Sequence, residues 1–176
     1  MKTLIKSLTV LLALFFIVYA QAMPVTELKR DNSNKVVFKI RFQNGSIADP
    51  ADKPGLTFAT ASMLAQGGAG GKTYPEIQDM MEPWASFYYV SVDKQVTTFT
   101  FQVPVDFVNE FYPLVRNVML APNFDETDFS RLMKSQQNYV DQVVRASSDE
   151  DYSKYALEHL LFRGGNMQHL LQGTSE

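Results

Sequence analysis

Cysteine is absent from the 176-residue sequence, and histidine is nearly absent. Without cysteine the chain cannot form disulfides, so its stability has to come from a buried core. His159 and His169 are the available bases for a serine hydrolase, and no G-x-S-x-G motif accompanies them. The glycine-rich stretch 67–73 does not form a phosphate-binding loop, because Gln66 stands where that motif requires glycine. These absences argue against a disulfide scaffold, a serine hydrolase and a P-loop protein.

An excess of positive charge is also lacking. The net charge is −3 at pH 7 and the pI is about 5.4, so the sequence gives no indication of nucleic-acid binding. With 45% hydrophobic and 20% charged residues, the composition is that of a globular protein. The length suffices for one domain with a substantial core.

The N-terminus has the pattern of a secretory signal peptide. Lys2 and Lys6 precede the apolar run Leu8 to Val18, which is shorter than the ~20 residues that span a bilayer. The small-x-small site at 20–22 predicts cleavage after Ala22. A buried N-terminal helix or a membrane anchor is the alternative. We expect residues 1–22 to be removed and the mature chain, residues 23–176, to be secreted, most simply to a bacterial periplasm. Loss of two lysines and no acid changes the net charge from −3 to −5.

Strand and helix patterns alternate along the mature chain. Alternation over 35–43 predicts a strand with Phe38, Ile40 and Phe42 on one face. Residues 56–66 and 74–81 predict two helices, the second with a proline in its first turn. The segments 86–92 and 96–103 flank a turn and predict a hairpin.

Two longer helices follow, each with one apolar stripe, and a third is predicted over 150–162. The stripes comprise Phe107, Phe111, Leu114, Val115, Val118 and Met119 in the first helix, and Phe129, Leu132, Met133, Gln136, Val140 and Val143 in the second. This order of elements predicts an α+β fold, in which an antiparallel sheet is covered on one face by helices.

The third helix contains Glu158 and His159, which resemble the end of an H-x-x-E-H zinc motif. A catalytic zinc requires three protein ligands and an open position. Tyr155 and Arg163, four residues to either side of His159, are not plausible partners, and His169 lies ten residues away. We therefore interpret Glu158 and His159 as ordinary helix residues. An active zinc peptidase that uses His159, Glu158 and His169 stays as an alternative.

Residues 55–82, GLTFATASMLAQGGAGGKTYPEIQDMME, resemble the signature region of the pitrilysin/insulinase family of zinc metallopeptidases. The segments 41–55, 103–133 and 161–174 are similar to the family's flanking strand and loop, its long helices and its later glycine-threonine segment. The resemblance covers essentially all of residues 25–176, in the family's order. It implies a pitrilysin/insulinase-like half-domain, of which residues 23–176 would be the N-terminal part, truncated at the C-terminus.

The resemblance places the inverted zinc motif at residues 58–62. Phe58 and Ser62 then replace the two histidine ligands, and Ala61 replaces the glutamate that acts as general base. The third ligand would fall near 139–143, where Asp141 is the only carboxylate. Without ligands no zinc is held, and without zinc and the base no water is activated. We expect no catalytic residues, no metal and no cofactor in this chain, with zinc only in a catalytic partner.

The resemblance thus implies an exported, catalytically inactive homologue that pairs with a zinc-bearing peptidase subunit as a heterodimer. It would help to form a peptide-binding chamber and would hold peptide substrates at a sheet edge. A stand-alone peptide-binding or assembly protein, present as a homodimer, is the alternative. Gly67 to Gly71 is predicted to be mobile. Trp84, Tyr88 and Tyr89 are either peptide contacts or buried residues of the hairpin.

Overall fold

The computed structural model describes residues 24–174, and the predicted signal peptide lies outside these residues. Contacts divide the chain into two units at residues 32 and 33. In the first unit, residues 24–32 contain no helix or strand. The second unit, residues 33–174 of the described chain, holds all the elements discussed below. Over the part of the chain that the structure describes, no helix is long and apolar enough to cross a membrane.

Three antiparallel strands form one sheet: β1 (Lys35–Phe42), β2 (Phe87–Val92) and β3 (Thr97–Pro104), in the order β1-β3-β2. In the register of the sheet, Phe101 of the central strand is paired with Phe38 of β1 on one side and with Tyr88 of β2 on the other. The predicted strands and hairpin are confirmed. The predicted alternation on β1 is confirmed: Phe38 and Ile40 pack against the core, and the Phe42 ring, 40% exposed at the strand end, meets Phe99 on the same face.

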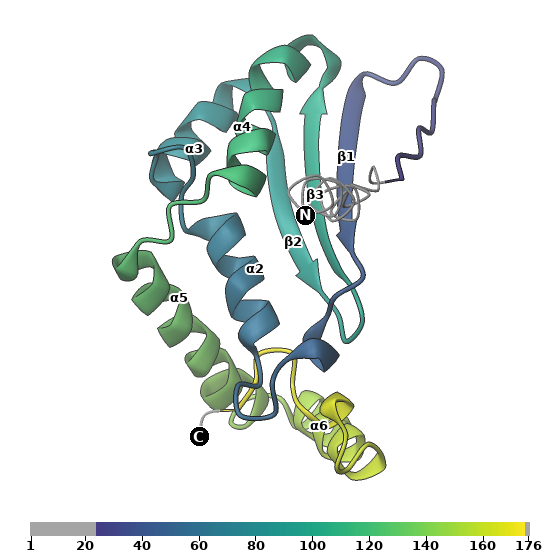
Figure 1. The fold of residues 1–176 in the computed structure, drawn as a ribbon, viewed down its shortest axis with the longest axis vertical. Coiled ribbons are helices and arrows are strands. Elements are labelled where there is room, and N and C mark those ends of the chain that lie inside the picture. The colour runs from purple at the N-terminus through teal and green to yellow at the C-terminus, as the bar shows by residue number, and fades with distance from the viewer. Residues whose placement is uncertain (1–23, 175–176) are drawn as a thin grey trace, which may run out of the picture. The chain divides into compact units, whose positions relative to one another are not determined.

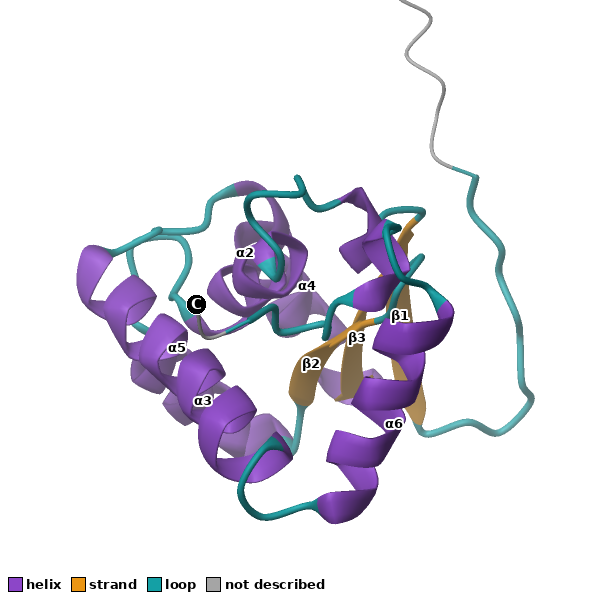
Figure 2. Cartoon of the chain, turned by 90° about the horizontal axis from the view of Figure 1, so that it is seen from below, coloured by secondary structure: helices purple, strands orange, loops and turns teal. Residues whose placement is uncertain are grey.

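Five α-helices accompany the sheet within the described residues: α2 (Leu56–Gln66), α3 (Tyr74–Met81), α4 (Val108–Leu120), α5 (Glu126–Asn138) and α6 (Asp149–Leu161). Figures 1 and 2 place α2 and α4 on the same side of the sheet, with α3 beside them. The predicted α+β fold, an antiparallel sheet covered on one face by helices, is confirmed.

Helix α2 is apolar or small on all sides and contains no charged residue. Such a helix is buried on more than one face. Its buried residues are Ala59, Ala61, Met63 and Ala65. Ala61 and Ala65 belong to the core under the sheet, while α2 also contacts α5. In Figure 1, α2 accordingly lies between the sheet and α5.

The core lies between the sheet and helices α2, α3 and α4. Its largest fully buried side chains include Phe99 and Phe101 of β3 and Phe111 of α4. The predicted stripe on α4 is confirmed, because its central residues are buried and Phe107 and Met119 pack against the same cluster. Helix α3 begins with a capping box between Thr73 and Glu76.

The stripe predicted on the next helix is only partly correct. Leu132 and Val140 are buried as expected, whereas Phe129 is exposed at the start of α5. Val143 is 41% exposed and its neighbour Val144 is 2% exposed. The reason is a π-helical turn over Tyr139–Val144. Its wider turn brings the next residue of the buried face around one position later than an α-helix would.

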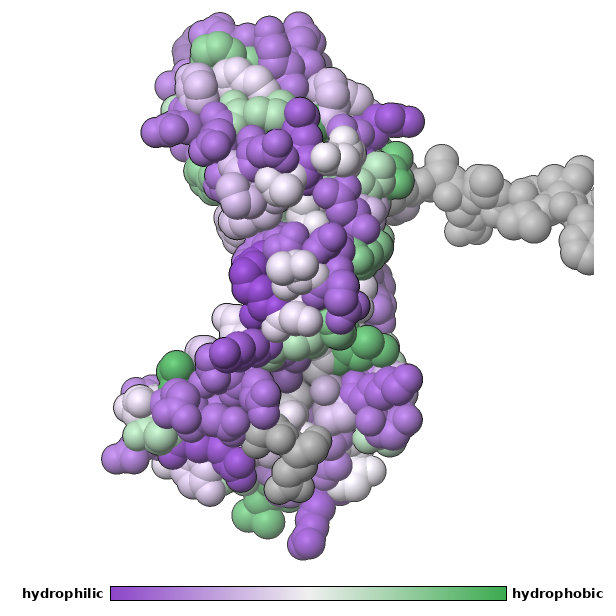
Figure 3. Space-filling model, turned by 90° about the vertical axis from the view of Figure 1, so that its left-hand side faces the viewer, coloured by the Kyte–Doolittle hydropathy of each residue, from purple (hydrophilic) through white to green (hydrophobic). Residues whose placement is uncertain are grey.

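The side of the molecule that carries α3 and α5 is largely hydrophilic, with hydrophobic residues exposed singly or in small groups (Figure 3). Helix α6 differs from the other helices in having no buried residue. Its exposed apolar side chains, with the Phe162 ring that follows, are Leu157, Leu160, Leu161 and Phe162.

Candidate functional site

The three positions of the predicted degenerate motif lie in the middle of α2. Phe58 and Ser62 are one turn apart on one side of the helix and are half-buried. Ala61 is buried in the core under the sheet. The motif positions therefore present a phenyl ring, a methyl group and a hydroxyl group.

The start of α2 is fixed by a buried carboxylate from outside the helix. Gly55, at the N-cap, has φ 89° and no side chain to cap the helix. Asp49 takes over this role, since its Oδ2 accepts from the Gly55 N–H and its Oδ1 from the Thr57 N–H, both at 2.8 Å. The Thr57 hydroxyl donates to Oδ1 as well. A negative charge at a helix N-terminus is also favoured by the helix dipole.

A cavity of about 320 Å³, called the apolar cavity below, opens between the first half of α2 and the adjoining end of the sheet. Its wall consists of Phe42, Asn44, Ala48, Asp49, Pro50, Leu56, Thr57, Thr60, Ala61, Leu64, Thr97 and Phe99. Ala61 is the one motif position in this wall. An apolar wall with a few polar groups is typical of a site that accepts a small ligand or a single side chain.

The side chains at the motif positions do not fit zinc. A zinc ligand has to be an imidazole, a thiolate or a carboxylate, and residues 58, 61 and 62 provide none of these. Asp141, the carboxylate nearest the expected third position, forms an ion pair of 3.9 Å with Arg145. Within residues 24–174, no three His, Asp or Glu side chains gather as a metal site would require. No hydrolytic step through a metal can be derived from these residues.

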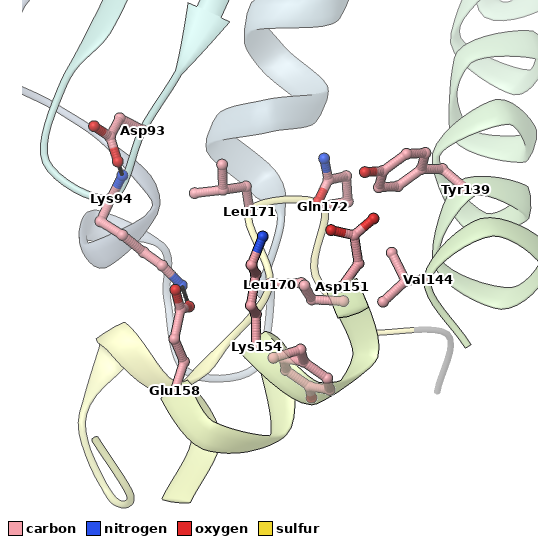
Figure 4. Close-up of a pocket in the computed structure, with 11 residues that line it drawn as sticks. Asp93, Lys94, Tyr139, Val144, Asp151, Lys154, Glu158, Leu170, Leu171 and Gln172 are labelled. Carbon is pink, nitrogen blue, oxygen red and sulfur yellow. Dashed lines mark hydrogen bonds and ion pairs between the residues drawn. The ribbon is translucent and has the colours of Figure 1, made fainter. Parts of the chain in front are cut away.

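The alternative ligand Glu158 has a different partner. Its Oε2 lies 3.1 Å from Nζ of Lys94, at the tip of the β2–β3 hairpin. The same Nζ donates to the carbonyl oxygens of Met167, at 3.1 Å, and His169. Figure 4 shows Lys94 extended from the hairpin toward Glu158 on α6. Lys94 therefore joins the hairpin to α6 and to residues 167–174, which are called the C-terminal segment below.

This ion pair borders a second cavity, of about 280 Å³, called the charged cavity below. Figure 4 shows the residues of its wall, which are Asp93, Lys94, Tyr139, Val144, Asp151, Lys154, Tyr155, Glu158, Leu170, Leu171 and Gln172. Neither histidine belongs to this wall. His159 lies exposed on α6 with its ring 6.0 Å from that of Tyr155, and Nε2 of His169 is 3.5 Å from the Gln168 amide. The geometry does not assemble His159, Glu158 and His169 around one point.

Two of the three candidate peptide-contacting aromatic residues, Trp84 and Tyr88, pack against the hydrophobic core. Tyr88 stacks on Phe101 with the ring centres 5.3 Å apart, and burial raises the pKa of its hydroxyl far above the ordinary value. Trp84 meets Phe111 edge to face at 6.5 Å. Tyr89 instead points to the opposite face of the sheet, where it is exposed. Tyr89 is therefore available to a partner, whereas Tyr88 and Trp84 are structural.

The segment Gly67 to Gly71 is held in place by its neighbours. The Gly70 N–H donates to Ala121 at 2.8 Å, and Asn123 accepts from the Gly71 N–H at 3.0 Å. The Asn123 amide also donates to the Lys72 carbonyl at 2.8 Å. These bonds offset the ordering entropy of the glycines. The mobility of this segment stays a prediction, and the sequence contained no sign of the contribution from Asn123.

A contact that sequence reasoning did not anticipate joins the C-terminal segment to the start of α2. The Gln136 amide donates to the carbonyls of Gln172, at 2.6 Å, and Gly55, at 3.3 Å. Gly173 has φ 82°, and a Cβ there would lie 2.2 Å from the Pro54 carbonyl oxygen. Glycine is required at both Gly55 and Gly173, because a Cβ at either position would collide with the backbone of the other segment.

Comparison with solved structures agrees with this architecture, whereas no family model and no curated protein matches the sequence. Among solved structures, an inactive domain of peptidase M16 from Pseudomonas fluorescens is similar, with a TM-score of 0.72 and 18% identity over 82% of this chain and 34% of that chain. A protease from Helicobacter pylori is similar with a TM-score of 0.68 and 10% identity, over 81% of this chain and 34% of that chain.

These likenesses define the class of fold. The chain has a pitrilysin/insulinase-like fold and spans about a third of the length of the solved chains that it matches.

Proposed function

We propose that this protein is an exported, catalytically inactive metallopeptidase homologue that pairs with an active zinc-bearing subunit. In that pair it completes a peptide-binding chamber and contributes no chemistry. Its own polypeptide holds no zinc or other cofactor, and the metal resides in the partner. After removal of residues 1–22 the protein acts in the periplasm or outside the cell.

One observation carries this proposal. On the alignment that the resemblance implies, the positions of α2 that would hold the metal carry no metal ligand, and the helix packs against the core under the sheet. Ala61 is buried in the core, and Phe58 and Ser62 are half-buried. A phenyl ring and a methyl group favour an apolar helix surface and provide a poor environment for a divalent cation.

The peptide-binding role is supported by the apolar cavity and by the sheet edge. With the order β1-β3-β2, β1 is an outer strand, and an outer strand offers unpaired backbone groups to an added peptide strand. Phe42 at the end of β1 lines the apolar cavity. A peptide that follows this edge could place one apolar side chain in the cavity.

The first test is the zinc content of the mature protein, measured by mass spectrometry after dialysis against trace zinc. We expect fewer than about one zinc per ten chains, because catalytic zinc sites require three protein ligands. One zinc per chain together with peptide hydrolysis would overturn the proposal. The double variant His159→Ala/His169→Ala would then show whether those two residues hold the metal.

The second test concerns pairing. Tagged protein is purified from its own host, and the co-purified chain is sequenced and assayed with and without this protein. We expect one partner with an intact H-x-x-E-H motif, whose peptidase activity increases on pairing. A homodimer with no peptidase partner would favour the stand-alone binding protein instead.

The apolar cavity is tested with a filled variant. Thr60 is exposed on α2 and lines the cavity, so Thr60→Phe should obstruct it without disturbing the core. We expect the complex with the peptidase partner to show a raised KM for peptides with large apolar side chains and an unchanged kcat. This pattern arises when the substrate and the transition state lose the same binding energy. Thr127→Phe, at an exposed position of α5, is the matched control. Equal KM values for the two variants would show that the cavity is not part of the peptide-binding site.

A further inference from the structure

The face of the sheet that α2 and α4 leave uncovered has a distinct composition. Strand alternation directs Val37, Lys39 and Arg41 of β1 to this face, and Phe87 and Tyr89 of β2 lie on it as well. Thr100 of β3 lies between them, paired with Lys39 on one side and with Tyr89 on the other, and is itself only 6% exposed. The exposed side chains of Lys35, Val37, Lys39, Arg41, Phe87 and Tyr89 are called the open sheet face below.

The charge on the open sheet face is entirely positive. Lys35, Lys39 and Arg41 are exposed, and the three strands contain no acidic residue. Within residues 33–174, none of the three cations forms an ion pair. The chain as a whole carries a net charge of −3, so this cationic row departs from the general character of the protein.

An aromatic pair lies opposite the cationic row. Phe87 and Tyr89 are 44% and 51% exposed, and their rings stack at 6.3 Å with an interplanar angle of 17°. Two strand spacings, about 10 Å, separate β1 from β2. Lysine on an outer strand can serve simply to prevent edge-to-edge aggregation. That explanation does not account for two exposed rings on the other outer strand.

We infer that the open sheet face is a docking surface for an acidic polypeptide segment with apolar side chains. Its carboxylates would pair with Lys39 and Arg41, and its apolar groups would cover Phe87 and Tyr89. Cations beside stacked rings also suit single-stranded nucleic acid. With a net charge of −3 and a pI of about 5.4 the sequence gives no indication of nucleic-acid binding, so we commit to a polypeptide and use single-stranded DNA as a comparison probe. This surface is distinct from the apolar cavity and does not depend on a peptidase partner.

The test is fluorescence anisotropy with a short labelled peptide in which glutamate and leucine alternate. A lysine-leucine peptide and an oligothymidine are the comparison probes. We expect the mature protein to bind the acidic peptide most tightly and less tightly as salt increases. Preference for the oligothymidine, or equal binding of both peptides, would overturn the proposal.

Charge reversal identifies the surface. Lys39→Glu/Arg41→Glu should weaken binding about tenfold, the value expected for two lost surface ion pairs together with the new repulsion. Arg116→Glu/Lys134→Glu, at exposed positions of α4 and α5, makes the same charge change elsewhere and should have little effect. Phe87→Ser/Tyr89→Ser should weaken binding and leave its salt dependence unchanged.

Hydrogen exchange of the unmodified protein gives an independent readout if a variant fails to fold. Bound acidic peptide should slow exchange in β1 and β2 more than in α4 and α5. Equal losses in the two charge-reversed variants, or protection confined to the helices, would place the binding site elsewhere and contradict the inference.

Discussion

The β3 strand and helix α6 are opposite extremes in how completely their side chains are buried. Phe99, Phe101 and Val103 of β3 are almost completely buried, and Phe101 contacts aromatic rings of β2 and α4. Helix α6 buries no residue and leaves Leu157, Leu160 and Leu161 exposed. Both segments are rich in apolar residues, so hydrophobicity alone does not decide which of them forms the core.

The difference lies in what holds each region in place. The sheet is stabilised by apolar burial, which contributes about 25 cal/mol per Å². Helix α6 is held by polar contacts: Lys94 to Glu158 and to the carbonyls of the C-terminal segment, and the Ser148 cap at its start. A region with few buried apolar contacts opens more readily than the core. The following predictions test this contrast, from the largest expected effect to the smallest.

Truncation of Phe101 should have the largest effect. Phe101 is 0% exposed, and Phe101→Ala leaves a cavity in the core, which costs about 3–5 kcal/mol. Leu161 is 65% exposed, and Leu161→Ala should change stability by no more than about 0.5 kcal/mol. Chemical denaturation of both variants measures the difference. Similar losses would mean that α6 is part of the core.

The buried carboxylate of Asp49 should come second. Asp49→Ala removes three hydrogen bonds at the start of α2 and leaves two N–H groups without their partner. We expect a loss of about 2–3 kcal/mol, the range for hydrogen bonds to a charged group. Asp125→Ala removes an exposed cap of α5 and should cost about 1 kcal/mol. If the two variants lost the same free energy of unfolding, the role of Asp49 would be that of an ordinary cap.

Lys94→Met should affect α6 more than the core. The change leaves Glu158 and two carbonyl groups without their cation, so we expect faster hydrogen exchange over residues 149–174 and little change in β3. Lys154→Met is the matched control. Lys154 forms an exposed pair with Glu150, whose hydrogen bond raises the lysine pKa, and exposed pairs of this kind contribute little to stability. Accelerated exchange in β3 would show that α6 is coupled to the core.

The smallest effect concerns the α3 capping box. Hydrogen bonds from the Thr73 N–H and hydroxyl hold the pKa of Glu76 below its usual value of 4.5. Because the folded-state pKa is depressed, the contribution of Glu76 is complete above about pH 4.5 and is lost as the pH falls through the lower folded value. Thermal melts of Glu76→Gln should therefore differ from those of the native protein at pH 7 and converge with them near pH 3. A constant difference across this range would rule out the carboxylate as the cause.

Local patterns in the sequence predicted most of the fold. The bounds of α2 and α3 agree with prediction, because a small apolar segment ends at glycines and a proline occupies the first turn of the next helix. The one stripe that failed, at Val143 and Val144, failed because a π-helical turn changes the period to which the pattern refers.

The candidate site was less accessible to sequence reasoning. Residues 58, 61 and 62 provide no imidazole, thiolate or carboxylate, and this lack of zinc ligands can be read from residue type alone. The ion pair of Lys94 with Glu158 and the carboxylate cap from Asp49 could not be foreseen. Both join segments that are distant in sequence, and no local period or spacing records such a contact.

The sequence by itself determined the order of helices and strands, the absence of disulfides and the lack of ligands on α2, because these depend on local periodicity and on residue type. The tertiary structure alone decided which apolar segment forms the core and which stays exposed. It also decided that cations on β1 and aromatic rings on β2 share one face of the sheet. The physical reason is that burial and electrostatic environment depend on neighbours brought together by folding, and adjacency in the sequence does not specify them.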